Sequence, residues 1–324
     1  MKCLLGLVFI LVCATCRPAQ AVEGGFGLYQ LGSRDLFAGI VPPPGIYWNN
    51  DIYYFTAKAP VIPIGGVAVR NPKLDAFVYK FNGTMVFPDT LFGGSVGLNV
   101  NMPFAKAKMD YSGVLGGAFP GLLSAQDKES GQGDLSINPI IGWHDGKLHY
   151  SLSMPIYFPT GKYSTATIDV RARTIDALRV GKNRFGVDPT LAFTYFDPQT
   201  GIDVSAAAGV TINTKNDKTN YQTAPEFHFE GTAAQHLANG LTFGGTFYAY
   251  QQLANDSGVG AQNIQRVTGA TTLKARVFGA GPVVNYSTRI GTTAVSFKFK
   301  YLHEFGAKRR FESKVYWGTL GLAW

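Results

Sequence analysis

Apolar and polar side chains alternate over most of the chain. Between Leu148 and Phe158 the even positions are apolar, and between Ile202 and Asn213 the same alternation returns with isoleucine, valine and alanine. Successive side chains of a β-strand point to opposite faces, whereas a helix would scatter these residues around its surface. The period of two therefore predicts strands that have one apolar and one polar face.

The alternation predicts about twelve strands. Most have at least the roughly nine residues that a tilted strand needs to cross a membrane. The predicted strands lie near Asn50–Lys58, Leu74–Phe87, Phe92–Phe104, Gly133–His144, Lys147–Phe158, Phe185–Phe196, Gly201–Asn213, Tyr221–Ala234, Gly240–Gln251, Gly269–Tyr286, Gly291–Glu304 and Phe311–Trp324.

The connections between these strands sort by length. Tight turns rich in Gly, Asn, Asp and Pro alternate with mostly longer loops, and the predicted strand count is even. This layout predicts an all-β fold, a closed antiparallel transmembrane β-barrel of the outer-membrane type. A soluble sandwich or lipocalin-like barrel would also alternate, but its turns would not sort so regularly by side. The predicted turns are residues 88–91, 144–147, 197–201, 237–240 and 287–290, and the loops are 59–73, 105–132, 159–184, 214–220, 252–268 and a short one at 305–310.

The end of the chain supports the membrane barrel. Tyr316, Leu320, Leu322 and Trp324 share one parity, and the chain ends on the aromatic residue. Terminal strands of outer-membrane barrels present such a pattern to the barrel assembly machinery, so these four residues are a candidate assembly signal and that machinery a predicted partner.

Composition agrees with a barrel wall. Charged residues make up only 15% of the 324 residues, whereas aromatics reach 13% and glycine supplies 39 positions. Disorder needs few aromatics and many charges, and collagen needs a regular glycine period, so both classes are excluded. A strand that faces lipid with every second side chain explains the low charge content.

Residues 1–21 have the features of a secretory signal peptide. Lys2 is followed by an apolar stretch too short to span a bilayer, and Ala19-Gln20-Ala21 fits a cleavage site. Cleavage after Ala21 removes Lys2 and Arg17, which lowers the formal charge from +8 to +6, and removes all three cysteines. The mature chain is predicted to reach the outer membrane of a Gram-negative bacterium without disulfides.

Residues 22–49 precede the first predicted strand and do not alternate. This glycine- and proline-rich segment is expected to be an insert or plug in the lumen or periplasmic mouth, with residues 50–324 forming the barrel; a mobile, exposed leader is the alternative. If inserted, its apolar residues would line a substrate pathway. These are Tyr29, Leu31, Phe37, Ile40, Tyr47 and Trp48.

Several ionisable residues fall on the polar parity of the strands. Such residues two apart on a strand are separated by about 6–7 Å, too far for one ion without help from neighbouring strands. They are predicted to line the lumen, and no metal or other cofactor is expected. The residues are Glu226, His228, Glu230, Lys298, Lys300 and Glu304.

One motif match concerns catalysis. Gly93-Gly94-Ser95-Val96-Gly97 satisfies the pattern of a nucleophile elbow, but the elbow requires a strand, a sharp turn and a helix, whereas Ser95 lies in a predicted strand. No catalytic residue is predicted, and an outer-membrane esterase is the least favoured function.

Basic residues gather in two predicted loops. Lipopolysaccharide phosphates are better partners for them than nucleic acid, because the protein is exported and Lys and Arg bind phosphate oxygens well. Solvated loops are an equally good explanation. The candidate contacts are Arg171, Arg173, Lys308, Arg309 and Arg310.

Motifs spread over most of the mature chain resemble the family named for the meta-pathway of phenol degradation. They are Pro43-Pro44-Gly45, Tyr53-Tyr54, Gly131-Gln132-Gly133-Asp134-Leu135, Pro139, Gly142-Trp143, His149, Pro159–Tyr163, Asn183–Thr190, Thr194-Tyr195 and Glu226-Phe227-His228. The resemblance implies an outer-membrane barrel similar to long-chain fatty acid and aromatic-hydrocarbon channels, hence passive uptake of small hydrophobic or aromatic compounds. The alternative is a plugged structural or surface-binding barrel without transport.

Overall fold

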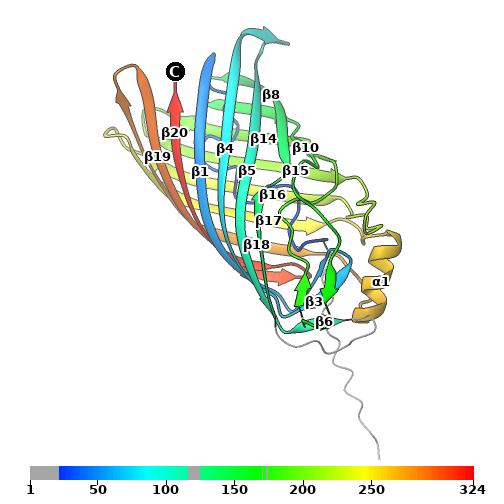
Figure 1. Ribbon diagram of the computed structural model, residues 1–324. Coiled ribbons are helices and arrows are strands. Elements are labelled where there is room, and N and C mark those ends of the chain that lie inside the picture. The colour runs from blue at the N-terminus through cyan, green and yellow to red at the C-terminus, as the bar shows by residue number, and fades with distance from the viewer. Residues whose placement is uncertain (1–21, 116–124, 170, 173) are drawn as a thin grey trace, which may run out of the picture.

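The computed structural model describes residues 22–115, 125–169, 171–172 and 174–324. The predicted signal peptide, residues 1–21, and its predicted cleavage site lie outside the described residues. The chain forms a closed antiparallel barrel of 12 strands, as predicted (Figure 1). Pairing of the last strand with the first and of β8 with β5 closes the ring, so no edge is left unpaired.

Nine of the barrel strands are continuous and three are made of two parts. The continuous ones are β1 (Gly45–Lys58), β4 (Lys73–Leu91), β5 (Gly94–Tyr111), β15 (Ile202–Asn213), β16 (Glu226–His236), β17 (Leu241–Gln252), β18 (Arg276–Ile290), β19 (Thr293–Lys308) and β20 (Glu312–Ala323). The two-part strands are β7 (Ala125–Gln132) with β8 (Leu135–Asp145), β10 (Ile156–Phe158) with β9 (Leu148–Ser153), and β13 (Gly186–Val187) with β14 (Thr190–Asp197).

Two of the breaks coincide with prolines. Pro155 separates β9 from β10 and Pro189 separates β13 from β14, because proline has no N–H to donate to a neighbouring strand. The carbonyls of these prolines still accept hydrogen bonds. Asp188 N donates to Pro155 O at 2.9 Å and Val210 N donates to Pro189 O at 3.3 Å, so the wall stays joined across the breaks.

Tight turns stand at one end of the barrel, together with the C-terminus, and we call this the turn end (Figure 1). Turns such as those at Gly146 and Gly291 need a positive φ, which glycine adopts without strain. The opposite loop end carries the longer connections. These contain β2 (Val61–Ile64), β3 (Val67–Arg70), β6 (Gly113–Leu115), β11 (Thr167–Asp169), β12 (Thr174–Asp176) and α1 (Gly258–Thr268).

The outer face of the barrel is apolar and the inner face is polar, as the alternation predicts. Large exposed side chains occupy the outward parity of nearly every strand, for example Phe77 on β4 and Leu152 on β9. The inward parity carries buried ionisable residues such as Asp51, Lys80 and Glu230. This is the pattern of a wall that faces lipid outside and a polar lumen inside.

The helix α1 was not predicted. Residues 252–268 were expected to be a loop and a strand was expected from Gly269, but α1 covers Gly258–Thr268 and β18 begins only at Arg276. Gly269 ends the helix in the left-handed conformation, and Ala261 and Ile264 bury the helix against the loop end. In the described part of the chain, no helix has the length and hydropathy needed to span a bilayer.

Some strand ends also differ from the prediction. The predicted turns 88–91 and 287–290 belong to strands, because β4 runs to Leu91 and β18 to Ile290. The first strand begins earlier than expected, at Gly45, so residues 45–49 belong to the barrel wall and the insert consists of residues 22–44.

Candidate functional site

The insert, residues 22–44, runs through the lumen from the loop end to the turn end. At the loop end, Gly24 N donates to Pro63 O in the β2–β3 hairpin at 2.7 Å. Near the turn end, Gly39 N donates to Thr194 Oγ1 at 2.9 Å, before the chain enters β1 at Gly45. The insert therefore occupies the lumen over the height of the barrel wall.

The first described residue of the insert is bound by a buried carboxylate. Val22 N donates to Asp256 Oδ2 at 3.0 Å, and Tyr221 Oη and Ala224 N donate to the same carboxylate. Burial raises the pKa of the Asp256 carboxyl above its usual range, although these hydrogen bonds oppose the shift. Among the described residues, no lysine, arginine or histidine forms an ion pair with Asp256.

Wall carboxylates hold the middle of the insert by its backbone. Glu230 on β16 accepts hydrogen bonds from Gly32 N at 2.5 Å and Arg34 N at 2.6 Å. Asp203 on β15 accepts one from Phe37 N at 3.1 Å. Hydrogen bonds to a charged acceptor are stronger than neutral ones, so these contacts fix the path of the insert.

One ionic contact has its acid on the insert. Asp35 lies 2.7 Å from Lys298 Nζ and 2.8 Å from Lys300 Nζ, both on β19, and Lys300 also donates to Gly32 O. Burial alone would raise the pKa of Asp35, but the two ammonium groups outweigh burial and lower this pKa to about 2. The Asp35 carboxylate is therefore ionised throughout the physiological range.

The predicted row of ionisable residues on β16 lies beneath the insert. The ring of Tyr29 stacks on His228 with centroids 3.6 Å apart, and His228 Nε2 lies 3.0 Å from Asp188 Oδ1. Glu226, His228 and Glu230 are all buried. They face the lumen but contact the insert rather than open space. In the described residues, no group of three or more His, Cys, Asp or Glu is arranged to hold a metal ion.

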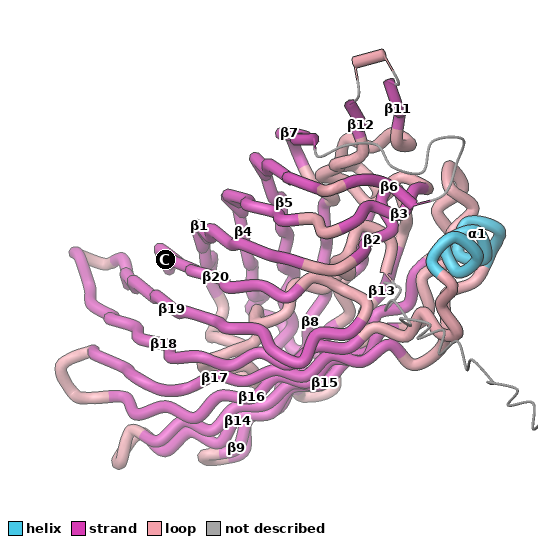
Figure 2. Tube along the Cα trace, turned by 90° about the horizontal axis from the view of Figure 1, so that it is seen from below, coloured by secondary structure: helices cyan, strands magenta, loops and turns pink. Residues whose placement is uncertain are grey.

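Beside the insert, a cavity of about 800 Å³ remains in the lumen. The insert is held by Glu230, Asp203 and Lys298 on one side of the barrel, and the cavity lies between it and the wall of β1, β4, β5 and β8. Residues of β17–β20 also contribute to the lining of the cavity. Figure 2 shows these two walls from below, with β1, β4 and β5 on one side and β14–β18 on the other.

The two halves of the cavity differ in polarity. Toward the loop end its lining includes an apolar surface formed by Phe55, Leu74, Ala76, Val78, Ala105, Ala107 and Leu178. The charged residues Glu23, Asp134, Arg179, Lys182, Glu304 and Arg310 line the same end beside it. Toward the turn end it is polar and comprises Asn49, Asp51, Lys80, Asn82, Asn99, Asn101, Ser136, Asn138 and Lys298. A molecule in this cavity thus meets an apolar wall at one end and hydrogen-bonding groups at the other.

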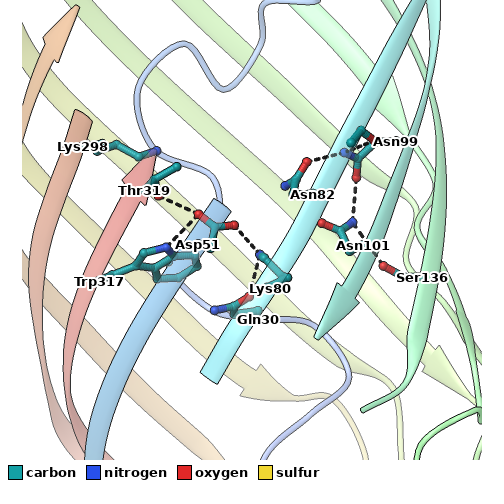
Figure 3. Close-up of polar contacts among 12 residues, drawn as sticks. Gln30, Asp51, Lys80, Asn82, Asn99, Asn101, Ser136, Lys298, Trp317 and Thr319 are labelled. Atoms are coloured by element: carbon teal, nitrogen blue, oxygen red, sulfur yellow. Dashed lines mark hydrogen bonds and ion pairs between the residues drawn. The ribbon is translucent and has the colours of Figure 1, made fainter. Parts of the chain in front are cut away.

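Lys80 in the polar half is already paired. Lys80 Nζ lies 3.2 Å from Asp51 Oδ2 and donates to Gln30 Oε1 of the insert at 2.9 Å (Figure 3). Asp51 Oδ1 also accepts hydrogen bonds from Trp317 Nε1 at 3.1 Å and Thr319 Oγ1 at 2.6 Å. The charges of this wall are therefore neutralised within the protein.

Most of the predicted pathway residues reach the cavity. Tyr29, Leu31, Phe37 and Ile40 of the insert contribute to its lining, and so does Tyr47, although Tyr47 belongs to β1. Trp48 is the exception, because it stands on the outward parity of β1 and its side chain is exposed on the outer face. Of the predicted lumen residues, Lys298, Lys300 and Glu304 line the cavity.

The predicted lipopolysaccharide contacts separate. Arg171 is exposed at the loop end, whereas Arg173 lies outside the described residues. Lys308 ends β19 and Arg309 follows it. Arg310 turns inward instead, since it is buried, lies 3.3 Å from Glu304 and packs over the ring of Tyr250. Arg310 is therefore part of the lumen and not of the surface.

The polar half of the cavity was missed at the sequence level, apart from Lys298. Asn82, Asn99 and Asn101 stand on the inward parity, so alternation marks them as lumen residues. Nothing in the sequence distinguishes them from inward residues that the insert covers. That distinction depends on the path of the insert, which alternation does not encode.

The family model described as "Putative MetA-pathway of phenol degradation" matches residues 57–320. The chain belongs to this family. The match covers nearly the whole barrel and agrees with the motifs in Gly131–Leu135 and Asn183–Thr190. No curated protein matches the chain.

Solved structures share the fold of this family member. An outer membrane channel from Pseudomonas putida F1 is 14% identical, with 91% of this chain and 100% of that chain covered and a TM-score of 0.65. A FadL homologue from Pseudomonas aeruginosa is 9% identical, with 86% and 90% covered and a TM-score of 0.46. The beta domain of the Bordetella autotransporter BrkA is 11% identical, with 86% and 98% covered and a TM-score of 0.45. The barrel has the fold of the outer membrane channel from Pseudomonas putida F1.

Proposed function

We propose that the protein is an outer-membrane channel for passive uptake of small hydrophobic or aromatic compounds. The observation that carries the proposal is the cavity of about 800 Å³ beside the insert, whose loop-end half is lined by Phe55, Leu74, Val78 and other apolar residues. Pockets of this size and polarity suit small organic ligands. The family's association with phenol degradation supports an aromatic substrate.

The orientation follows from the two kinds of connection. Outer-membrane barrels have short periplasmic turns and longer extracellular loops, so the turn end faces the periplasm and the loop end the cell surface. A substrate would then enter at the apolar half of the cavity and leave through the polar half. Both ends of the barrel, Gly45 and Trp324, lie on the periplasmic side in this orientation.

We propose that the leader is cleaved after Ala21. Cleavage at this bond would make Val22 the N-terminus, and its α-ammonium group would lie against the buried Asp256 carboxylate. A buried carboxylate is rarely left without a cation. The α-ammonium group created at the predicted cleavage site would thus supply the cation that the Asp256 carboxylate lacks among the described residues.

The insert would act as the plug of this channel. Its backbone is held by Glu230 and Asp203, and Asp35 is paired with two lysines of β19. Substrate would pass along the open wall of β1, β4, β5 and β8 while the insert blocks larger solutes.

Two surfaces would serve the membrane environment. Arg171, Lys308 and Arg309 at the loop end are placed to contact lipopolysaccharide phosphates. On the outer face, Tyr316 and Trp324 are exposed, and Leu320 and Leu322 share their parity on β20. We propose that these four residues are recognised by the barrel assembly machinery.

A catalytic function has less support. Ser95 is the second residue of β5, pairs with Thr90 and Gly142, and is followed by strand rather than helix. A nucleophile elbow requires the helix. The proposal is therefore transport without chemistry.

Uptake of a labelled aromatic hydrocarbon into cells with and without the gene tests the proposal. We expect faster uptake in cells that carry the gene, over a panel that also includes alkanes, phenols and fatty acids. Equal rates for every compound would defeat the channel and favour a plugged structural or surface-binding barrel.

A further inference from the structure

Three asparagines and a serine form a hydrogen-bonded row on the open wall of the cavity. The row runs from Asn82 on β4 through Asn99 and Asn101 on β5 to Ser136 on β8 (Figure 3). Asn82 stands directly opposite Asn101 in the pairing of β4 with β5. We call these four residues the amide row.

The backbone fixes the orientation of each amide in the row. Asn99 Nδ2 lies 3.2 Å from the carbonyl oxygen of Gly83, which can only accept, so the nitrogen of Asn99 must face it. The same nitrogen lies 2.6 Å from Asn82 Oδ1 and 2.8 Å from Thr84 Oγ1, so its second hydrogen is shared between these two oxygens and the oxygen of Asn82 faces the row. Asn99 Oδ1 then accepts from Asn101 Nδ2 at 2.7 Å, and this nitrogen also lies 3.3 Å from Ser136 Oγ.

Among the described residues, this order leaves the amide nitrogen of Asn82 and the amide oxygen of Asn101 free. Within the described part of the chain, Asn82 Nδ2 and Asn101 Oδ1 have no hydrogen-bond partner. Both residues are half-buried and line the cavity. Cross-strand neighbours have Cβ atoms about 5 Å apart, so the free N–H and the free C=O of the pair are within reach of one small group.

The surroundings of the pair select the chemistry of that group. A hydroxyl can donate to Asn101 Oδ1 and accept from Asn82 Nδ2 at the same time. A carboxylate is less suitable, because the lysines beside the row are paired already, Lys80 with Asp51 and Lys298 with Asp35. A neutral hydroxyl is therefore the best complement.

The wall above the pair suits an apolar body. Val78 stands four residues from Asn82 along β4, and Ala105 stands four from Asn101 along β5; these two residues also pair with each other. Pro103 and Lys80, which is paired with Asp51, stand between them and the amide groups. A strand rises about 3.3 Å per residue, so the apolar wall begins within about 13 Å of the free amide groups. That distance matches an aromatic ring with a short alkyl chain.

Resting on the proposed channel, we propose that the cavity binds neutral amphiphiles that carry one hydroxyl. The hydroxyl occupies the space between Asn82 Nδ2 and Asn101 Oδ1, and the apolar body lies against Val78 and Ala105. Hydrocarbons without a hydroxyl enter the same cavity but leave both amide groups without a partner. Hydroxylated compounds are therefore bound in preference, with the polar end toward the turn end.

Equilibrium dialysis of the detergent-solubilised full chain tests the site directly. The probes are 4-butylphenol and 4-butyltoluene, which differ by a hydroxyl in place of a methyl group. Three variants are compared with the wild type in the same detergent. The partition of each probe into micelles is then the same for every variant and cancels when the variants are compared. They are the double variant Asn82→Ala with Asn101→Ala, the isosteric Asn82→Asp, and Asn285→Ala as a control.

Asn82→Asp keeps the oxygen that accepts from Asn99 and replaces the free amide nitrogen by a charged carboxylate oxygen, which can only accept a hydrogen bond. Asn285 is also a cavity-lining asparagine, but it lies on β18, outside the amide row. The wild type is expected to bind the phenol about tenfold more tightly than the toluene, since two hydrogen bonds of ordinary strength suffice for this ratio. The double variant should lose most of this preference, and Asn285→Ala should keep it. Asn82→Asp should change the preference, because the hydroxyl can then donate to residue 82 or to Asn101 but accepts from neither.

Equal binding of the two probes by the wild type, or an unchanged preference in both Asn82→Asp and the double variant, overturns the amide site. Failure of both probes to bind overturns it as well. These results are distinct from failure of the proposed channel, which is read from uptake by cells and requires no preference for a hydroxyl. A channel that transports both probes equally would stand without the amide site.

Discussion

At the scale of single residues, Asp35 links the insert to the barrel wall. It is buried between Lys298 and Lys300, of which Lys300 is buried and Lys298 half-buried. Removing one partner of a buried pair costs about 3–5 kcal/mol, because the remaining charge loses its compensation. The docking of the insert should therefore be sensitive to this carboxylate.

The pH dependence of docking follows from the lowered pKa of Asp35. The docked state favours the ionised carboxylate, so its contribution is complete above the ordinary pKa of 3.8 and is lost as the pH falls toward about 2. A shift of this size corresponds to about 2 kcal/mol. In planar bilayers, we expect the conductance to stay low between pH 8 and 5 and opening events to begin below about pH 4.

The variant Asp35→Asn should show such openings already at pH 7. Asp145→Asn, which changes an exposed residue at the turn end, serves as the control. Conductance of Asp35→Asn that stays at the wild-type level at every pH would show that the two lysines do not hold the insert.

Asp256 provides a second test at this scale. With Val22 as the N-terminus, its α-amino group should be protected from an amine-reactive label in the native protein, because Val22 and Asp256 are both buried. Asp256→Asn should expose it, whereas Asp217→Asn in an exposed part of the loop end should not. Mass spectrometry of the N-terminal peptide measures the labelling. A mature chain that begins elsewhere than Val22 would contradict the proposed cleavage.

The sequence indicated which of these residues face the lumen, but not their partners. Alternation placed Lys298, Lys300, Glu226 and Glu230 on the inward parity of their strands. It could not pair Lys298 with Asp35, which is 263 positions away in a segment without a repeating pattern. Trp48 was predicted to line the pathway because the first strand was expected to begin only at residue 50. The residue therefore fell in the predicted insert and was not assigned a parity.

At the scale of elements, the insert and the barrel are independent in their backbone pairing. Every barrel strand pairs with two neighbouring strands, and the insert contributes to none of these ladders. A chain lacking residues 22–44 should therefore still form the barrel. Its lumen would lose the segment that covers Glu230, Asp203 and Lys300, so water would reach these residues.

Deletion of residues 22–44 is expected to raise the single-channel conductance severalfold. The full chain prepared in the same way is the reference, and heat-modifiable migration in gels verifies that the shortened barrel is folded. A folded barrel whose conductance is unchanged would show that the insert does not restrict the lumen.

The regular strands were the most predictable elements and the loop-end structures the least. Twelve strands could be read from period two because lipid imposes it on every wall segment. The segment Ala125–Gln132 was missed as strand, since its residues extend beyond the apolar zone and include Asp127, Lys128 and Glu129. The helix α1 was missed because its eleven residues begin with Gly258-Val259-Gly260, which is unfavourable for a helix, and bury only Gly260, Ala261 and Ile264.

At the scale of the whole molecule, the protein consists of a closed barrel wall, a central insert and a cavity between the two. The wall satisfies the backbone in lipid, and the insert runs through the lumen. In the described part of the chain, the cavity beside the insert leaves room for a solute, mainly along β1, β4, β5 and β8 and also against residues of β17–β20. The central claim is therefore that transport depends on this cavity and not on the barrel as a whole.

Filling the cavity tests that claim most directly. Ala76 and Ala105 line its apolar half, and replacing both with tryptophan should close the path while leaving the strand pairing intact. Leu98→Trp adds similar bulk on the outer face and is the matched control. The measurement is uptake of a labelled aromatic hydrocarbon by cells that produce each variant at equal levels in the outer membrane. We predict that the double variant takes up no more than cells without the gene and that Leu98→Trp matches the wild type; wild-type uptake by the filled variant would contradict the account.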